Sequence, residues 1–151
     1  IAATRDDEVV AGAVVDIGRG DVFSAARDHG ARLDGSTIEP STVTRLAESL
    51  IGTGFSYTSQ GRATEAEYLA RVLPAGRDIR CFGSAALNLC WVACGRLDGF
   101  YQRNMRYWDF AAGEIIAAEA GAAIARPRPE NGQLMVVSGP GIHDELARLV
   151  S

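Results

Sequence analysis

The sequence predicts one region of mixed α/β fold, in which an antiparallel meander precedes helices that alternate with short strands. The first forty residues hold short apolar stretches separated by polar or glycine-containing turns, which is typical of antiparallel strands. From Leu46 onward, helical patterns alternate with short apolar stretches, which indicates an α/β layer. A chain of 151 residues with 47% hydrophobic content can bury one core, and no internal repeat or domain boundary interrupts it.

The charge and the apolar pattern exclude several classes of partner. The net charge is −4 and the sequence contains no lysine, which argues against a nucleic-acid-binding surface. No apolar run approaches the roughly 20 residues of a membrane span, and the N-terminus has no signal-peptide pattern. We therefore expect neither nucleic acid nor membrane as a partner.

The three cysteines, Cys81, Cys90 and Cys94, form no Cys-x-x-Cys pair. Cys90 and Cys94 lie four residues apart on an expected helix, so they share a face and could in principle hold a soft metal. Buried free thiols are the more common case for such residues. This cysteine usage favours a reduced, cytoplasmic setting.

The opening meander is expected to contain strands over residues 9–15, 21–26 and 31–33. Residues 1–4 read as the end of a further strand, followed by a polar turn over residues 5–8. Residues 16–21 have the glycines of a hairpin connection. Because a meander of this size is marginally stable alone, other elements must cover it.

The remaining residues are expected to alternate between helices and strands. Helices are predicted over residues 41–49 (with Ser41 as the N-cap), 64–73, 84–94, 109–120 and at the C-terminus to about residue 149. Strands are predicted over residues 50–55, 78–82, 97–102, 122–125 and 134–138. Residues 56–64 read as a polar loop and residues 126–132 as a surface turn. The glycines of the 50–55 strand let another group approach closely or, as is commoner, mark a tight turn.

The stretch from Trp108 to Ala122 is the most informative part of the chain. Asp109 precedes a run of strong helix formers, where its carboxylate can accept from free backbone N–H groups. The small residues 111–113 predict that this helix starts tight against another backbone, and Gly121 ends it. Its glutamates, Glu114 and Glu119, are expected to face water. On physical grounds alone this is a capped amphipathic helix behind an aromatic residue.

The residue pattern of this stretch also resembles a known signature. Trp108-Asp109, the small triplet, three aliphatic positions and Gly121-Ala122 are together similar to the C-terminal signature of the inositol monophosphatase family. That resemblance implies a lithium-inhibited, Mg²⁺-dependent phosphomonoesterase, usually a homodimer, with Asp109 as a metal ligand. It also implies a layered α-β-α-β-α sandwich in which an antiparallel sheet precedes a mostly parallel one. Residues 1–40 would form the end of the antiparallel sheet, and residues 41–151 would form the α/β subdomain.

A second segment extends the resemblance. In the family, a Gly-Ser/Thr-Ala-Ala turn opens a helix at the active site and its backbone contacts a substrate hydroxyl, which implies this role for Gly83, Ser84 and Ala85. Ser84 can equally be an ordinary N-cap with Gly83 for the turn, and both can hold. Gln102 stands where the family usually has a Glu that accepts from an inositol hydroxyl. Gln keeps an acceptor oxygen but loses the charge.

The resemblance covers only the C-terminal part of such an enzyme. The family's Asp-Pro-Leu/Ile-Asp-Gly-Thr motif and upstream Glu-Glu, which supply most metal ligands, do not occur in these residues. We therefore expect this chain to be part of a phosphatase that acts on a polyol or sugar phosphate, such as inositol monophosphate. The chain alone is expected to be inactive. Histidinol-phosphate and fructose-bisphosphate phosphatases are the nearest alternatives, and a non-catalytic dimerisation or regulatory relative is the alternative from another class. The histidines, His29 and His143, match no catalytic position of the family.

Overall fold

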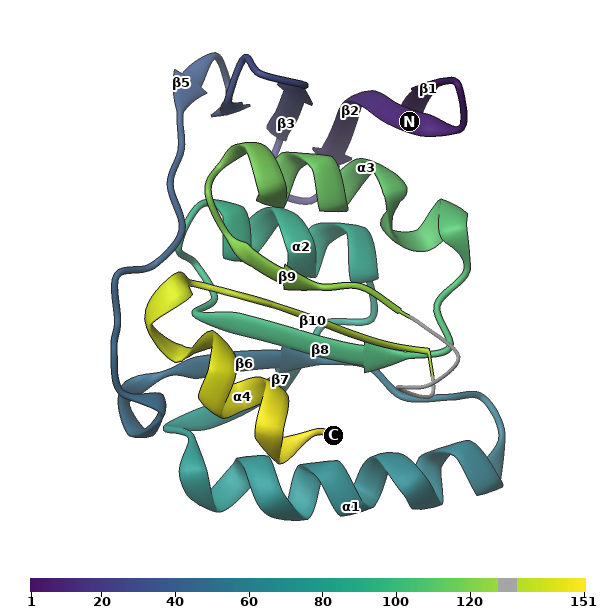
Figure 1. Cartoon of the computed structure of the whole chain (residues 1–151), viewed down its shortest axis with the longest axis vertical. Coiled ribbons are helices and arrows are strands. Elements are labelled where there is room, and N and C mark those ends of the chain that lie inside the picture. Colours follow the sequence, from purple (N-terminus) through teal and green to yellow (C-terminus); the bar gives the residue numbers. More distant parts are fainter. Residues whose placement is uncertain (128–132) are drawn as a thin grey trace.

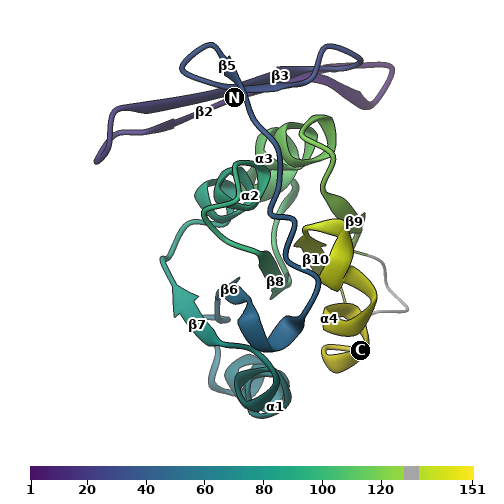
Figure 2. The same ribbon diagram turned by 90° about the vertical axis from the view of Figure 1, so that its left-hand side faces the viewer.

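The computed structural model describes residues 1–127 and 133–151 and arranges them in four layers. Figure 2 shows an antiparallel sheet, a layer formed by helices α2 and α3, a second sheet, and a layer formed by helices α1 and α4. This arrangement confirms the predicted α/β layered fold class. The expected surface turn over residues 126–132 lies mostly outside the described residues.

The first sheet is the predicted meander. Its strands are hydrogen-bonded in sequence order, with every pair antiparallel. The strands are β1 (Ala2–Arg5), β2 (Glu8–Asp16), β3 (Asp21–Ala26), β4 (Ala31–Leu33) and β5 (Ser36–Thr37). The hairpin between β2 and β3 pairs Asp16 with Asp21, and Gly20 takes a positive φ of 79° in its turn.

The second sheet has the order β7-β6-β8-β10-β9. Its strands are β6 (Leu50–Thr53), β7 (Asp78–Cys81), β8 (Gly99–Arg103), β9 (Ala123–Ala125) and β10 (Leu134–Ser138). Strand β6 is parallel to β7 and β8, whereas β10 is antiparallel to β8 and β9. Four strands therefore run in one direction and only β10 runs against them, which agrees with a mostly parallel sheet.

The two faces of the second sheet bury separate clusters. One cluster lies between this sheet, helices α2 and α3 and the meander; its fully buried members include Phe23, Leu89, Phe100, Ile116 and Val137. The other lies towards helices α1 and α4 and includes Ile51, Val72, Tyr101, Val136 and Leu146. Neighbouring residues of β8 and β10 thus point to opposite faces, as strand geometry requires.

The helices are α1 (Ser59–Ala75), α2 (Ala85–Ala93), α3 (Tyr107–Glu119) and α4 (His143–Leu149), with 3-10 turns at Leu46–Glu48 and Pro140–Ile142. The predicted loop over residues 56–64 is confirmed for residues 56–58 and wrong from residue 59, because α1 already begins at Ser59. Its N-cap is Thr58, whose Oγ1 accepts from the Gly61 N–H at 3.2 Å. The first turn of α1 is exposed and polar, so its composition resembled that of a loop.

The predicted helix over residues 41–49 is also wrong. Apart from the 3-10 turn at Leu46–Glu48, this segment is not helical, and Ser41 Oγ accepts from the Val43 N–H at 3.2 Å without capping a helix. Three consecutive β-branched residues, Thr42 to Thr44, weaken helix formation. The extended segment instead packs against residues 139–141, where a Cβ on Gly139 would lie 2.3 Å from the Ser41 carbonyl oxygen.

Helices α2 and α3 are in close contact, as the small residues 111–113 predicted. A Cβ on Gly113 would lie 2.7 Å from Leu89 Cβ and 3.1 Å from the Ala86 carbonyl oxygen. On the opposite side of α3, a Cβ on Gly12 would lie 2.8 Å from the Ala112 carbonyl oxygen. Real Cβ atoms avoid such distances, so glycine permits the approach of α3 to both neighbours.

The expectation that Glu114 faces water is wrong, whereas Glu119 is half-buried. Glu114 is paired with Arg126, and its side chain is only 12% exposed. Glu119 accepts from three successive backbone N–H groups of the β3–β4 turn, those of Asp28, His29 and Gly30 at 3.1, 3.2 and 2.9 Å. Both carboxylates therefore fasten α3 to other segments, which a helical periodicity alone does not reveal.

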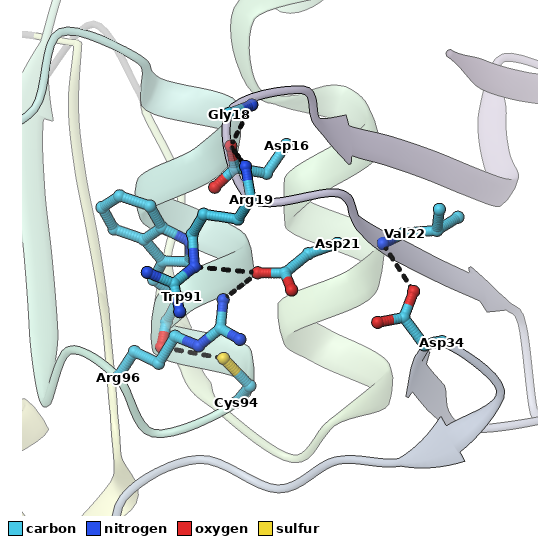
Figure 3. A network of polar contacts seen from close by, with 9 residues as sticks. All are labelled: Asp16, Gly18, Arg19, Asp21, Val22, Asp34, Trp91, Cys94 and Arg96. Carbon is cyan, nitrogen blue, oxygen red and sulfur yellow. Dashed lines mark hydrogen bonds and ion pairs between the residues drawn. The ribbon is translucent and has the colours of Figure 1, made fainter.

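A polar network ties the β2–β3 hairpin to the C-terminal end of α2 (Figure 3). Asp21 lies between Arg19 and Arg96, with an Arg19 Nε to Asp21 Oδ2 distance of 3.2 Å. The hydrogen bond from Arg96 lowers the pKa of Asp21 below its ordinary value, and burial opposes this change. The meander is therefore joined to the helical layer by charge as well as by apolar packing.

The cysteines take different environments. Cys90 is buried, and desolvation raises the pKa of its thiol. Cys94 is half-buried with its Sγ 3.6 Å from the Trp91 carbonyl oxygen, and burial raises its pKa too. Cys90 is thus a buried free thiol as expected and Cys94 is a partly buried one, whereas Cys81 is exposed at the end of β7.

Candidate active site

An open cleft of about 910 Å³ lies where the parallel strands β6, β7 and β8 end. Thr53 and Cys81 are the last residues of β6 and β7, Gln102 and Arg103 are the last two of β8, and all four line the cleft. Figure 1 shows β8 pointing to the side of the molecule on which α1 and α3 begin. Ligands of open α/β sheets bind beyond the carboxyl ends of the strands, so the topology makes this cleft the primary candidate site.

Three helices begin at this cleft. The residues that cap the N-termini of α1, α2 and α3 are Thr58, Ser84 and Arg106, and all of them line it. Free backbone N–H groups and the helix dipole favour an anion near a helix N-terminus. Arg103 and Arg106 also line the cleft and add positive charge near it, with Arg103 Nη1 donating to the Tyr68 hydroxyl. These features favour a negatively charged group in the cleft.

The residues predicted to contact a substrate hydroxyl come together on one wall. Gly83, Ser84 and Ala85 line the cleft, and Ser84 Oγ caps α2 by accepting from the Leu87 N–H at 3.3 Å. Gly83 has a φ of +80°, and a Cβ there would meet no atom within 4 Å. Glycine is thus required by the left-handed backbone and not by lack of space. The turn leaves the backbone on this wall open to a ligand.

Asp109 lines the cleft from α3, but it does not precede the helix as predicted. It is the third residue of α3, and its Oδ2 accepts from the Arg106 N–H at 2.8 Å. Helix α3 begins at Tyr107, two residues before the predicted range of 109–120, because two aromatic residues do not by themselves indicate a helix start. No other hydrogen bond from the described residues reaches this half-buried carboxylate, so its second oxygen can serve a ligand.

Gln102 lies on β8 with its amide group against the β6–α1 connection. A Cβ on Gly54 would lie 2.2 Å from Gln102 Oε1 and 2.9 Å from Gln102 Nε2. Gly54 therefore makes room for the amide, which settles the choice between a close approach and a simple turn in favour of the approach. The half-buried Gln102 and the carboxylate of Asp109 border the same cleft.

Comparison with known proteins assigns this arrangement to a family. The family model described as the inositol monophosphatase family matches residues 1–150. The chain belongs to the inositol monophosphatase family. It is 46% identical over 144 residues to the inositol-1-monophosphatase SuhB of Mycobacterium tuberculosis strain H37Rv, covering 91% of this chain and 50% of the relative. It is 39% identical over 113 residues to the Nus factor SuhB of Escherichia coli K12, covering 74% of this chain and 42% of the relative.

Solved structures of the inositol monophosphatase family share this fold. The Mycobacterium tuberculosis SuhB structure is 44% identical with a TM-score of 0.89, and the match covers 99% of this chain and 61% of that one. A Thermotoga maritima IMPase structure is 31% identical with a TM-score of 0.87, covering 99% and 58%. The chain spans about half the length of the curated relatives it matches.

The residues present offer one anionic ligand to a metal ion. Asp109 is the only carboxylate among the described residues that line the cleft. Within residues 1–127 and 133–151, no three His, Cys, Asp or Glu side chains come together as a metal-binding group. Mg²⁺ takes hard oxygen ligands, so Asp109 suits it as one member of a larger set of ligands.

None of the helices in the described ranges combines the length and apolar character that crossing a membrane requires.

Sequence reasoning missed several residues of the cleft. These are Ser56, Thr58, Cys81, Asn88, Arg103 and Arg106. Asn88 had a detectable signal, because it is a polar residue inside an otherwise apolar helix and its Oδ1 is buried without a partner among the described residues. Ser56 had none, because its importance depends on a contact with Glu65 that only the fold creates.

Proposed function

We propose that this chain forms the substrate-binding part of a Mg²⁺-dependent phosphomonoesterase that acts on a polyol or sugar phosphate. The observation that supports this most strongly is the convergence of three helix N-termini at the ends of three parallel strands, beside the carboxylate of Asp109. Such an edge favours a phosphate group, and the carboxylate favours a divalent cation. Family membership supports the same reaction class.

Different residues of the cleft would bind the metal ion, contact the substrate hydroxyls and stabilise the phosphate charge. When bound, Mg²⁺ polarises the phosphoryl oxygens and lowers the pKa of a bound water. Asp109 would ligate the ion through the oxygen that does not accept from Arg106. The backbone of Gly83, Ser84 and Ala85 and the amide of Gln102 would contact substrate hydroxyls on the opposite side of the phosphate. Arg103 and Arg106 would add a favourable field for the anion.

The neutral amide of Gln102 supports the substrate class. Gln102 offers both an acceptor and two donors, so it suits a ligand that is rich in hydroxyl groups. Relatives named inositol-1-monophosphatase support inositol monophosphate as the first candidate. Histidinol phosphate and fructose bisphosphate are the alternatives, and they differ from it in bearing an amine or a second phosphate.

A regulatory function is the second candidate. The relative of Escherichia coli at 39% identity carries the name Nus factor, and this name supports a role outside metabolism. Under that function, the cleft would be retained without substrate turnover. A homodimer and a cytoplasmic location remain predictions for either candidate.

The decisive experiment is a substrate panel with the purified full-length protein. Phosphate release would be measured with and without Mg²⁺ for myo-inositol 1-phosphate, histidinol phosphate, fructose 1,6-bisphosphate and p-nitrophenyl phosphate. We expect Mg²⁺-dependent release, with the highest kcat/KM for the inositol ester. Absence of turnover on every ester would overturn the enzyme assignment and favour the regulatory one.

A further inference from the structure

The connection between β6 and α1, residues 54–58, forms one wall of the cleft and is fastened from behind by α1. Ser56 is held at each of its polar groups. Its N–H donates to Glu65 Oε2 at 2.7 Å, and its hydroxyl donates to Glu65 Oε1 at 2.6 Å. Arg62 Nη1 donates to the carbonyl oxygens of Ser56 at 3.2 Å and Tyr57 at 2.9 Å. Residues of the first two turns of α1 thus hold this wall through hydrogen bonds.

The burial of Glu65, which holds Ser56, is unusual for an acidic side chain. Glu65 is 4% exposed, although acidic side chains are rarely buried without a reason. Both of its oxygens are engaged by the same residue, Ser56, and the short hydroxyl contact is typical of a charge-assisted hydrogen bond. The backbone contact holds the main chain of Ser56 in place. The second contact fixes the direction of the hydroxyl proton.

The direction of that proton has a chemical consequence. A serine hydroxyl has one proton and two acceptor lone pairs. Since the proton is donated to Glu65, Ser56 can only accept from a ligand in the cleft that it lines. The donor also carries extra negative character because its partner is a carboxylate. The neutral Gln102 lies against Gly54, two residues away on the same wall.

We propose that Glu65 is a positioning residue that makes Ser56 an acceptor for a substrate hydroxyl, and that this pair supplies the anionic character that Gln102 lacks. The inference rests on the proposed function, and it deepens it by naming a second residue that selects polyol esters. The ligand group is a hydroxyl that donates to Ser56 Oγ. A phosphomonoester without neighbouring hydroxyls gains nothing from the pair.

One substitution reverses the direction of the Ser56 hydroxyl proton while keeping a side chain of similar size at position 65. In Glu65→Gln, the amide oxygen remains available for the Ser56 N–H, and the amide nitrogen then faces the hydroxyl oxygen. Ser56 must accept from that nitrogen and turn its proton towards the cleft, so its polarity to the ligand is inverted. Ser56→Ala removes the acceptor altogether. Glu67→Gln is the matched control, because Glu67 is exposed on the same helix.

The test compares kcat/KM for myo-inositol 1-phosphate with that for p-nitrophenyl phosphate in the full-length protein. We expect Glu65→Gln and Ser56→Ala each to lower the ratio of the two values roughly five- to thirtyfold, chiefly through KM for the inositol ester. The double variant should lower the ratio no further than Ser56→Ala alone, because Glu65 acts through Ser56. Glu67→Gln should leave the ratio within about twofold of the parent.

Four outcomes would count against the inference or the proposed function. An unchanged ratio in Ser56→Ala overturns the inference even if Glu65→Gln is too unstable to assay. Additive effects of the two substitutions overturn the positioning role of Glu65. If the unaltered protein releases no phosphate from either ester, the proposed function itself fails. Turnover of both esters with an insensitive ratio leaves the proposed function standing and removes only this inference.

Discussion

The contact between α2 and α3 gives a prediction whose sign the structure decides. In Gly113→Ala, helix propensity alone would stabilise the protein by about 1 kcal/mol. The new Cβ, however, would lie 2.7 Å from Leu89 Cβ, 2.9 Å from Leu89 Cδ1 and 3.1 Å from the Ala86 carbonyl oxygen. Two of these atoms belong to or adjoin the backbone of α2 and cannot rotate away. We therefore place the crowding at about 3 kcal/mol, the upper end for overpacking.

The expected net effect of Gly113→Ala is a loss of about 2 kcal/mol in the free energy of unfolding, or about 4–8 °C in Tm for a chain of this size. Urea and thermal unfolding would measure it. Ala118→Gly, at an exposed position of the same helix, is the control and should cost only about 1 kcal/mol through propensity. A Gly113→Ala variant more stable than the parent would refute the reasoning. Since α2 and α3 carry Ala85 and Asp109 to the cleft, the variant should also lose turnover.

Three further predictions concern the chain, the substrate pocket and pH. The isolated 151-residue chain should be inactive on any phosphomonoester, because one carboxylate cannot hold Mg²⁺ against its hydration; Mg²⁺-dependent release above a heat-killed control would contradict this. Gln102→Glu in the full-length protein should raise kcat/KM for inositol monophosphate about three- to thirtyfold and change p-nitrophenyl phosphate little, because a charged acceptor binds a hydroxyl more strongly; equal, small effects on both esters would remove Gln102 from the pocket. Burial lowers the pKa of His143 below 6.5, so the unfolded chain binds the proton more readily than the folded chain. Stability should therefore be complete above pH 6.5 and fall on acidification below it, and His143→Gln should flatten this part of a urea-unfolding pH series.

The strands could be predicted because their signals are local. Apolar runs bounded by turn residues located the meander, and four of its five strands lie where residues 1–4, 9–15, 21–26 and 31–33 indicated. The errors arose where tertiary contacts decide. Residues 41–49 have apolar residues at helical spacing, but residues 41–44 pack closely against Gly139 and Gly141, and only Leu46–Glu48 form a 3-10 turn. No periodicity within the segment carries that information.

The candidate site divides in the same way. A short motif marked Asp109 and the turn at Gly83, and the fold brings them to one cleft with Gln102. The wall formed by residues 54–58 was not predicted, because its polar composition is that of an ordinary loop. Its order comes from Glu65, nine residues after Ser56, which reaches it only once α1 is packed on the sheet. A contact between a helix and the connection that precedes it can therefore be identified only when the three-dimensional structure is known.

The most direct test of the account is the behaviour of Asp109→Asn in the full-length protein. Asn can still accept from the Arg106 N–H, so the start of α3 and the fold should be retained. We expect weaker Mg²⁺ binding by isothermal titration and a loss of at least about two orders of magnitude in turnover at saturating Mg²⁺. An Asn variant with the Mg²⁺ affinity and turnover of the parent would contradict the assignment of Asp109 as a metal ligand.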